Sequence, residues 1–143
     1  MLIYSPNFGC IHQTLITMDI NKMTNSNLLY KLPELDSNPI VDDLAGWTAV
    51  EGKPKATMKT WIQHTSADGS IISGVWHATP GFWHTTYAAY EFVHLIEGSL
   101  TITPDGGETQ SYGPGDGFVV DAGFKGVWEI KTPVKKHFVI KIK

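Results

Sequence analysis

The sequence predicts an all-β protein, built as a barrel or sandwich of short strands. Short apolar segments recur along the chain from residue 58 onward, and turn-forming Gly, Pro, Asp and Ser residues separate them. No segment keeps the apolar spacing of a long helix. Many short strands at this spacing are typical of a β-barrel or β-sandwich.

The first two strands are expected to form a hairpin, in which MKTWIQH (58–64) and IISGVWHAT (71–79) flank the turn ADGS (67–70). Irregular backbone just after Pro80 and Gly81 could turn His84 inward. The later strands are predicted at residues 87–96, 99–103, 108–112, 117–120, 126–131 and 136–142.

One folded domain is expected, preceded by two further segments. The chain has 143 residues, which is enough to bury a core without disulfides. Residues 1–22 do not join cleanly to the remainder of the chain, and Met23 offers a later start, so we interpret them as a poorly ordered N-terminal extension. The alternative is a short arm that packs on a partner. Residues 23–46 are expected to form an extended arm, and residues 47–143 a barrel.

Composition excludes several classes of partner. The net charge is −3, and every basic residue is a lysine in a scattered position, so no nucleic-acid partner is expected. No apolar run is long enough for a membrane-spanning helix, so no membrane partner is expected. Cys10 is the single cysteine, which fits a reducing compartment, and a cytoplasmic location is expected.

Glu91 and Tyr87 are the candidate catalytic residues. Glu91 lies among apolar neighbours such as Phe92 and Val93, where an isolated carboxylate is costly to bury. We therefore predict that Glu91 faces the barrel interior and is functional. Tyr87 precedes it by four residues, and an even spacing keeps two side chains on one face of a strand. The two side chains are expected to hydrogen-bond one ligand together.

Three further residues are candidates for ligand binding. Trp128 comes after the glycine-containing turn at residues 123–126 and is predicted to place its ring at the mouth of the barrel. Trp76 belongs to a large aromatic set, of which most members are expected in the core and one or two at a ligand. Lys136 is the candidate cation, although an exposed surface lysine is the commoner interpretation.

His84 and Glu91 are the candidate ligands for a divalent transition metal. Neutral imidazole binds such ions well, but a catalytic metal usually has three protein ligands. His94 lies at an odd spacing from Glu91, which puts it on the opposite face of the strand. The remaining histidines of this region are expected at the surface, namely His64, His77 and His137. No cofactor is therefore certain.

A spaced set of residues resembles a known family. The set comprises Gly74, Trp76, Pro80, Gly81, Tyr87, Glu91, Glu97, Gly98, Gly113, Gly115, Asp116, Gly123, Gly126, Trp128 and Lys136. It is similar to the ureidoglycine aminohydrolase-like and ethanolamine-utilisation Q-type cupins. The resemblance implies a cupin (RmlC-like) double-stranded β-helix, which is a jelly-roll barrel, usually a homodimer with its pocket at one mouth.

The metal-binding positions of that family are changed in this chain. The first cupin motif places two histidines where this chain has Thr85 and Tyr87. The second motif places a histidine where this chain has Gly126, so only Glu91 remains. The aminohydrolases use Glu and His at the positions of Thr85 and Tyr87, and His at that of Glu91. The resemblance therefore implies a fold more than a reaction.

These observations support three hypotheses for function. The first is a small cupin-domain protein that binds a small polar metabolite in the barrel mouth, as an enzyme without a strong metal site or as a binding protein. Convergence of Tyr87 and Glu91 in a closed pocket would favour it. The second is a metal-dependent cupin hydrolase, like the ureidoglycine aminohydrolases, or an oxygenase. The third is a non-catalytic sensor or dimerisation module, which a pocket filled by Trp and Phe side chains would favour.

Overall fold

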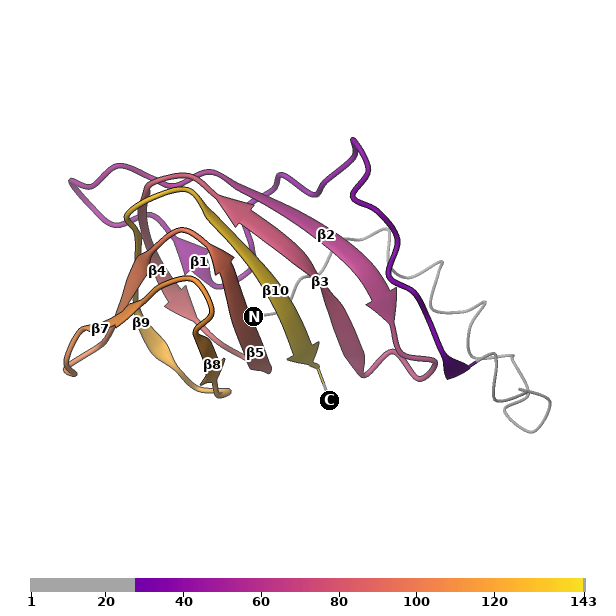
Figure 1. The fold of residues 1–143 in the computed structure, drawn as a ribbon. Coiled ribbons are helices and arrows are strands. Elements are labelled where there is room, and N and C mark those ends of the chain that lie inside the picture. Colours follow the sequence, from indigo (N-terminus) through magenta and orange to yellow (C-terminus); the bar gives the residue numbers. More distant parts are fainter. Residues whose placement is uncertain (1–27, 143) are drawn as a thin grey trace.

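Two antiparallel sheets pack face to face in the computed structural model, which describes residues 28–142 (Figure 1). This arrangement confirms the all-β prediction. The interpretation of residues 1–22 as an extension falls outside the described residues. Within residues 28–142, no helix is long and apolar enough to cross a membrane.

Each sheet has five strands. One sheet has the order β1-β4-β9-β6-β7, with the bounds β1 Trp47–Thr48, β4 Gly81–Thr86, β9 Lys125–Ile130, β6 Leu100–Pro104 and β7 Gln110–Tyr112. The other has the order β2-β3-β10-β5-β8, with the bounds β2 Met58–Thr65, β3 Ile71–Ala78, β10 Val134–Lys141, β5 Tyr90–Glu97 and β8 Gly117–Val120. Neighbours in the sheets are mostly distant in sequence.

The backbone after Pro80 and Gly81 is regular, so it does not turn His84 inward. It forms strand β4, which pairs with β9 along its whole length. Trp83 and Thr85 are buried between the sheets, whereas Phe82 and His84 are half-buried on the other face. Alternation of this kind defines a strand with one face in the core. The other predicted strands are present with ends shifted by up to three residues, and the short strand β1 was not predicted.

The core lies between the two sheets and is rich in tryptophan. Inward-facing residues alternate with outward-facing ones, most regularly along β5 and β10. The largest side chains with almost no exposed surface include Trp76, Trp83, Trp128, Tyr87, Leu95 and Leu100. Indole rings thus occupy much of the space between the two sheets.

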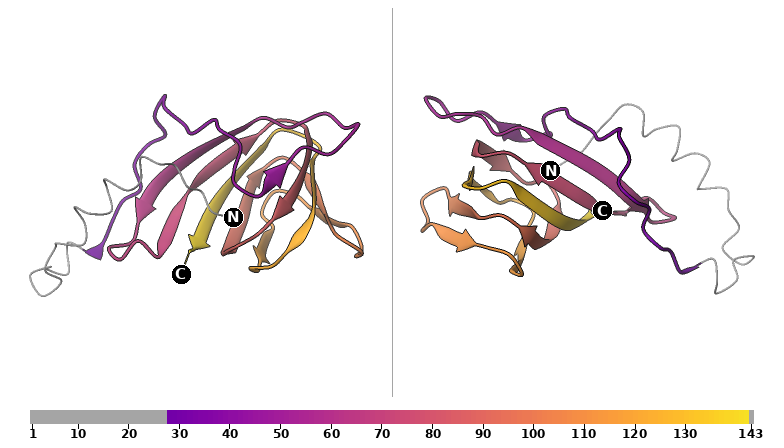
Figure 2. Two further views of the ribbon diagram at one scale, coloured as in Figure 1. Left: turned by 180° about the vertical axis from the view of Figure 1, so that it is seen from behind. Right: turned by 45° about the horizontal axis from the view of Figure 1, so that its top comes forward.

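Residues 28–46 form an extended segment before the first strand. Figure 2 shows the segment, in indigo, alongside β2. Ile40 and Thr60 exchange both backbone hydrogen bonds, at 2.8 and 2.9 Å. The indole N–H of Trp61 donates to the Asp36 carbonyl at 3.0 Å, and the Gln63 amide donates to the Pro33 carbonyl at 2.7 Å. The segment is therefore attached to the outermost strand of its sheet.

Candidate functional site

An ion pair lies buried between the sheets. The Lys136 Nζ is 2.5 Å from Glu91 Oε1, and the two side chains are 2% and 1% exposed. Lys136 on β10 lies opposite Leu95 on β5, so its side chain must extend along the interior to reach Glu91. The interpretation of Lys136 as an exposed surface lysine is wrong. Each charge is neutralised by the other, which is the condition for keeping both in the core.

Two indole rings enclose the Lys136 ammonium. Its Nζ lies 4.5 Å from the ring centroid of Trp76 and 4.8 Å from that of Trp128. Trp76 comes from β3 and Trp128 from β9, so the ammonium bridges the two sheets. Cation–π contacts of a desolvated ammonium stabilise by about 2 kcal/mol or more. The structure thus brings together all three predicted ligand-binding residues, although Trp128 is fully buried rather than at the mouth.

Tyr87 lies shortly before β5 and is fixed by the turn between β8 and β9. Its backbone N–H donates to the Phe124 carbonyl at 2.9 Å, and its carbonyl accepts from the Gly123 N–H at 2.7 Å. Its ring stacks on Trp128 with centroids 6.4 Å apart. Burial raises the pKa of the Tyr87 hydroxyl well above its ordinary value, and the negative charge of Glu91 raises that pKa further. Tyr87 is therefore a neutral hydrogen-bond donor at physiological pH.

Several buried polar atoms in this interior have no hydrogen-bond partner among the residues described. Around the ion pair these atoms are the indole nitrogens of Trp47, Trp76, Trp83 and Trp128, the Tyr87 hydroxyl, and Glu91 Oε2. Trp47 joins the group through ring contacts with Trp76 at 5.6 Å and with Trp128 at 5.3 Å. Buried polar groups are normally satisfied by protein, water or ligand. Four indole N–H donors are thus left without a partner, while the Tyr87 hydroxyl and Glu91 lie close enough for an interaction with that carboxylate to contribute to the raised Tyr87 pKa.

The raised pKa of Tyr87 predicts a loss of stability at alkaline pH. The unfolded chain releases the phenolic proton near the ordinary value of 10.0, whereas the folded protein retains it. The stabilising contribution is thus fully present below that pH and declines as the pH rises above it. We expect Tyr87→Phe to lack this decline. Urea unfolding of both proteins between neutral and alkaline pH measures it, and parallel curves would contradict the prediction.

The structure does not bring His84 to Glu91. His84 faces away from the interior on β4, and its Nε2 lies 3.0 and 3.1 Å from the two carboxylate oxygens of Asp105. The neighbouring Thr85 is the residue of β4 that faces inward, and its hydroxyl donates to the Gly126 carbonyl at 3.3 Å. A histidine at position 85 would have entered the interior, as in the family motif, but position 84 points outward.

The donor set around Glu91 does not fit a transition-metal ion. One carboxylate oxygen is held by the Lys136 ammonium, whose charge would repel a metal cation. Within residues 28–142, no group of three or more His, Cys, Asp or Glu side chains is placed to hold a metal. Metal binding by His84 and Glu91 stays a prediction, which elemental analysis of the purified protein can check.

An apolar cleft of about 340 Å³ lies beside this interior. It is lined by Ile102, Pro104, Gln110, Tyr112, Phe118, Val119, Val120, Asp121, Ala122 and Phe124. The Phe118 ring contacts Trp128 with centroids 5.9 Å apart, and the Phe124 ring contacts Tyr87, also at 5.9 Å. A single layer of aromatic rings, from Phe118 and Phe124, thus separates the cleft from Tyr87 and Trp128.

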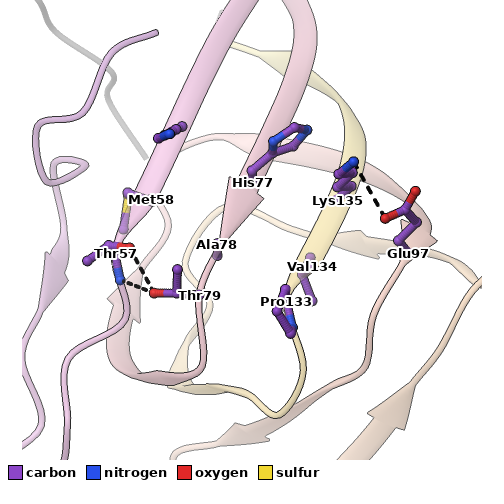
Figure 3. A pocket seen from close by; sticks show the side chains of 10 residues that line it. Thr57, Met58, His77, Ala78, Thr79, Glu97, Pro133, Val134 and Lys135 are labelled. Carbon is purple, nitrogen blue, oxygen red and sulfur yellow. Dashed lines mark hydrogen bonds and ion pairs between the residues drawn. The ribbon is translucent and has the colours of Figure 1, made fainter.

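A second cleft, of about 210 Å³, lies at the starts of β2 and β10 (Figure 3). Its polar side chains already contact one another, because the hydroxyls of Thr57 and Thr79 are hydrogen-bonded and Lys135 lies 3.6 Å from Glu97. Burial lowers the pKa of His77 in its wall, and the charge of Lys135 lowers that pKa further. None of the predicted site residues lines this cleft.

Sequence reasoning missed the ion pair and the participation of Trp47 and Trp83. The burial of Lys136 has a signal in the sequence, because Val134, Lys136, Phe138 and Ile140 alternate with polar residues and share the buried face of β10. Trp83 has the same signal within β4. Trp47 has none, since its strand has only two residues.

Two packed antiparallel sheets with polar residues buried between them are compatible with the jelly-roll class, to which the cupins belong. The chain belongs to the family of EutQ-like cupin domains, whose model matches residues 65–138. This match confirms both the family resemblance and the jelly-roll fold predicted from it.

Solved structures agree with this fold. A putative ethanolamine utilization protein Q from Salmonella typhimurium is 23% identical, with a TM-score of 0.51 over 60% of this chain and 68% of that one. EutQ from Clostridium difficile is 19% identical, with a TM-score of 0.55 over 62% and 70%. A DUF861-family protein from Pseudomonas syringae is 21% identical, with a TM-score of 0.56 over 71% and 46%. Identities this low show the fold alone, and no curated protein matches the chain.

Proposed function

We propose that this cupin binds a small, uncharged molecule with hydrogen-bond acceptors in the interior around Glu91 and Lys136. The observation that carries the proposal is the set of unpartnered buried polar atoms, in which donors outnumber acceptors. Glu91 and Lys136 already neutralise each other, so a charged ligand would add a buried charge without a partner. The surrounding aromatic rings favour a flat molecule.

Each residue has a distinct part in this proposal. Tyr87 donates to an acceptor of the ligand, because its high pKa keeps it protonated. Glu91 Oε2 accepts from an N–H or O–H of the ligand, while Oε1 stays with Lys136. Trp76 and Trp128 form the walls. If the protein is also an enzyme, this arrangement supports proton transfer between Glu91 and a ligand that Tyr87 holds.

Benzamide and benzoate provide a matched pair of probes, because they share a shape and differ in charge. We expect benzamide, at ten times its dissociation constant, to stabilise the protein by about 1.4 kcal/mol, which raises Tm by about 4 °C. Benzoate should leave Tm unchanged. Thermal unfolding followed by fluorescence measures both shifts.

Variants locate the binding. Tyr87→Phe and Glu91→Gln should each reduce the benzamide shift, because each removes one hydrogen bond to the ligand. Tyr90→Phe is the matched control, since Tyr90 lies on the outer face of β5 and is 37% exposed. The proposal fails if neither benzamide nor a panel of uncharged amides, lactams and nucleobases shifts Tm. It also fails if Tyr87→Phe and Tyr90→Phe respond alike.

We propose homodimerisation as a second function, which a row of apolar residues on the outer face of one sheet favours. Val139, Phe92 and Val119 lie opposite one another across β10, β5 and β8. They are 37%, 40% and 47% exposed. Adjacent exposed apolar side chains of this size are typical of an interface, and a second copy of the chain would cover them.

The expected state in solution is a dimer that a charge in this row disrupts. Phe92→Lys should raise the dimer dissociation constant by about tenfold or more, because it places a charge in an apolar interface. Sedimentation velocity across a concentration series measures this constant. Val41→Lys is the control, since Val41 lies on the extended segment and is 63% exposed. A monomeric wild-type protein would contradict the proposal.

A further inference from the structure

We infer that the cleft beside β8 is the port through which small uncharged molecules reach the tryptophan-lined interior, and that Phe118 and Phe124 close it. The inference rests on the proposed function in one respect, because the port leads to the same binding interior. It adds the route of entry and the two side chains that set the width of the ligand.

The cleft opens where the two sheets end. β7 is the last strand of one sheet and β8 the last strand of the other, and both lie at the same end of the sandwich (Figure 1). Side chains of β6, β7, β8 and the turn after β8 line a volume of about 340 Å³. This volume is sufficient for a small organic molecule.

Two phenylalanine rings form the inner wall of the cleft. Phe118 lies between Tyr112, with centroids 4.2 Å apart, and Trp128, at 5.9 Å. Phe124 lies against Tyr87. Phe118 and Phe124 are half-buried, whereas Tyr87 and Trp128 are fully buried. The two phenylalanine rings therefore separate the cleft from the buried rings of Tyr87 and Trp128, and they are the side chains that must move for a molecule to pass inward.

The turn that carries Phe124 is held by few interactions. Residues 121–123 are exposed, and the described backbone contacts of the turn to Tyr87 are two hydrogen bonds, at 2.7 and 2.9 Å. The Phe124 ring lies over Gly126, where an added Cβ would come within 2.6 Å of it. A typical hydrogen bond contributes about 1 kcal/mol net, so opening of this turn falls within the range of local fluctuations.

The lining of the cleft suits uncharged molecules. Most of its side chains are apolar, and its one charged group is the Asp121 carboxylate, which repels anions. The cleft of Figure 3 and a third cleft of about 360 Å³ near the extended segment are lined by outward-facing residues such as His77 and Lys135. Neither of them contacts Tyr87 or Trp128.

Quenching of tryptophan fluorescence tests the port without any ligand. In a Trp61→Phe background, the tryptophans left are Trp47, Trp76, Trp83 and Trp128, all of which are at most 4% exposed. Acrylamide, an uncharged amide, and iodide, an anion, serve as quenchers. We expect Phe118→Ala and Phe124→Ala to raise the acrylamide Stern–Volmer constant by about twofold or more, because each opens the inner wall. The gain with iodide should be much smaller.

Phe82→Ala is the matched control, because Phe82 is half-buried on the outer face of β4 and is not part of the cleft lining. Circular dichroism checks that each alanine variant is folded. If one is not, Phe118→Leu or Phe124→Leu replaces it in the quenching experiment, because leucine retains most of the apolar area. The port is overturned if quenching does not increase, or if Phe82→Ala gives the same increase. An equal gain with iodide overturns the preference for uncharged molecules. Efficient acrylamide entry without amide binding would contradict the proposed function and leave the port standing.

Discussion

Lys136→Met is expected to destabilise the protein by about 3 to 5 kcal/mol, because it leaves the Glu91 carboxylate buried without its partner. The variant also loses the ammonium contacts with Trp76 and Trp128. Urea unfolding at neutral pH measures the free energy of unfolding. Glu91→Leu should be destabilising to a similar degree, since it leaves a buried ammonium without a partner.

The double variant Glu91→Leu with Lys136→Met provides the control. It removes both charges and fills the interior with apolar groups of similar size, so we expect it to recover most of the stability lost by either single change. A double variant that is as unstable as the sum of the single variants would show that the two charges do not interact. That result would contradict the ion pair as the organising contact of the interior.

Gly98→Ala is expected to destabilise the protein by about 3 kcal/mol or more, because two effects combine at this turn between β5 and β6. Gly98 has a φ of 85°, and an added Cβ would lie 2.2 Å from the carbonyl oxygen of Pro133. The Pro133 backbone cannot move without displacing the start of β10, which is the strand that carries Lys136.

Gly106→Ala separates these two effects. Gly106 has a similar φ of 72°, but an added Cβ would meet nothing within 4 Å. This variant should lose only the backbone term, about 1 to 2 kcal/mol. Thermal unfolding of both variants gives the difference. Equal losses would indicate that the Pro133 backbone yields at little cost.

Local patterns in the sequence predict most of the fold. Alternation and turn residues locate most of the strands, and the inward face of Glu91 and Tyr87 follows from the cost of an unpaired buried carboxylate and from their even spacing. Strand β4 was missed because Pro80 and Gly81 indicate a turn, whereas the alternation from Phe82 to Thr85 continues beyond it. At β4 the alternation of buried and half-buried residues predicts the strand better than the turn-forming residues that precede it.

The site could be predicted only in part, because its central contact is non-local. Lys136 and Glu91 are 45 residues apart and meet because β10 inserts between β3 and β5. Local pattern supplies no such strand order. The residue type of Lys136 also favoured a surface position, since lysine is rarely fully buried unless it is paired. The free indole N–H groups depend on the packing of four strands and have no local signal.

The extended segment before β1 has a consequence for self-association. β2 is the outermost strand of its sheet, and its free edge is the kind of surface that recruits strands from other molecules. The exchange of hydrogen bonds between Ile40 and Thr60, together with the donation from Trp61 to Asp36, occupies part of that edge. The segment therefore covers part of the β2 edge and limits edge-to-edge aggregation. Its removal would expose β2 to pairing with a strand of a second chain.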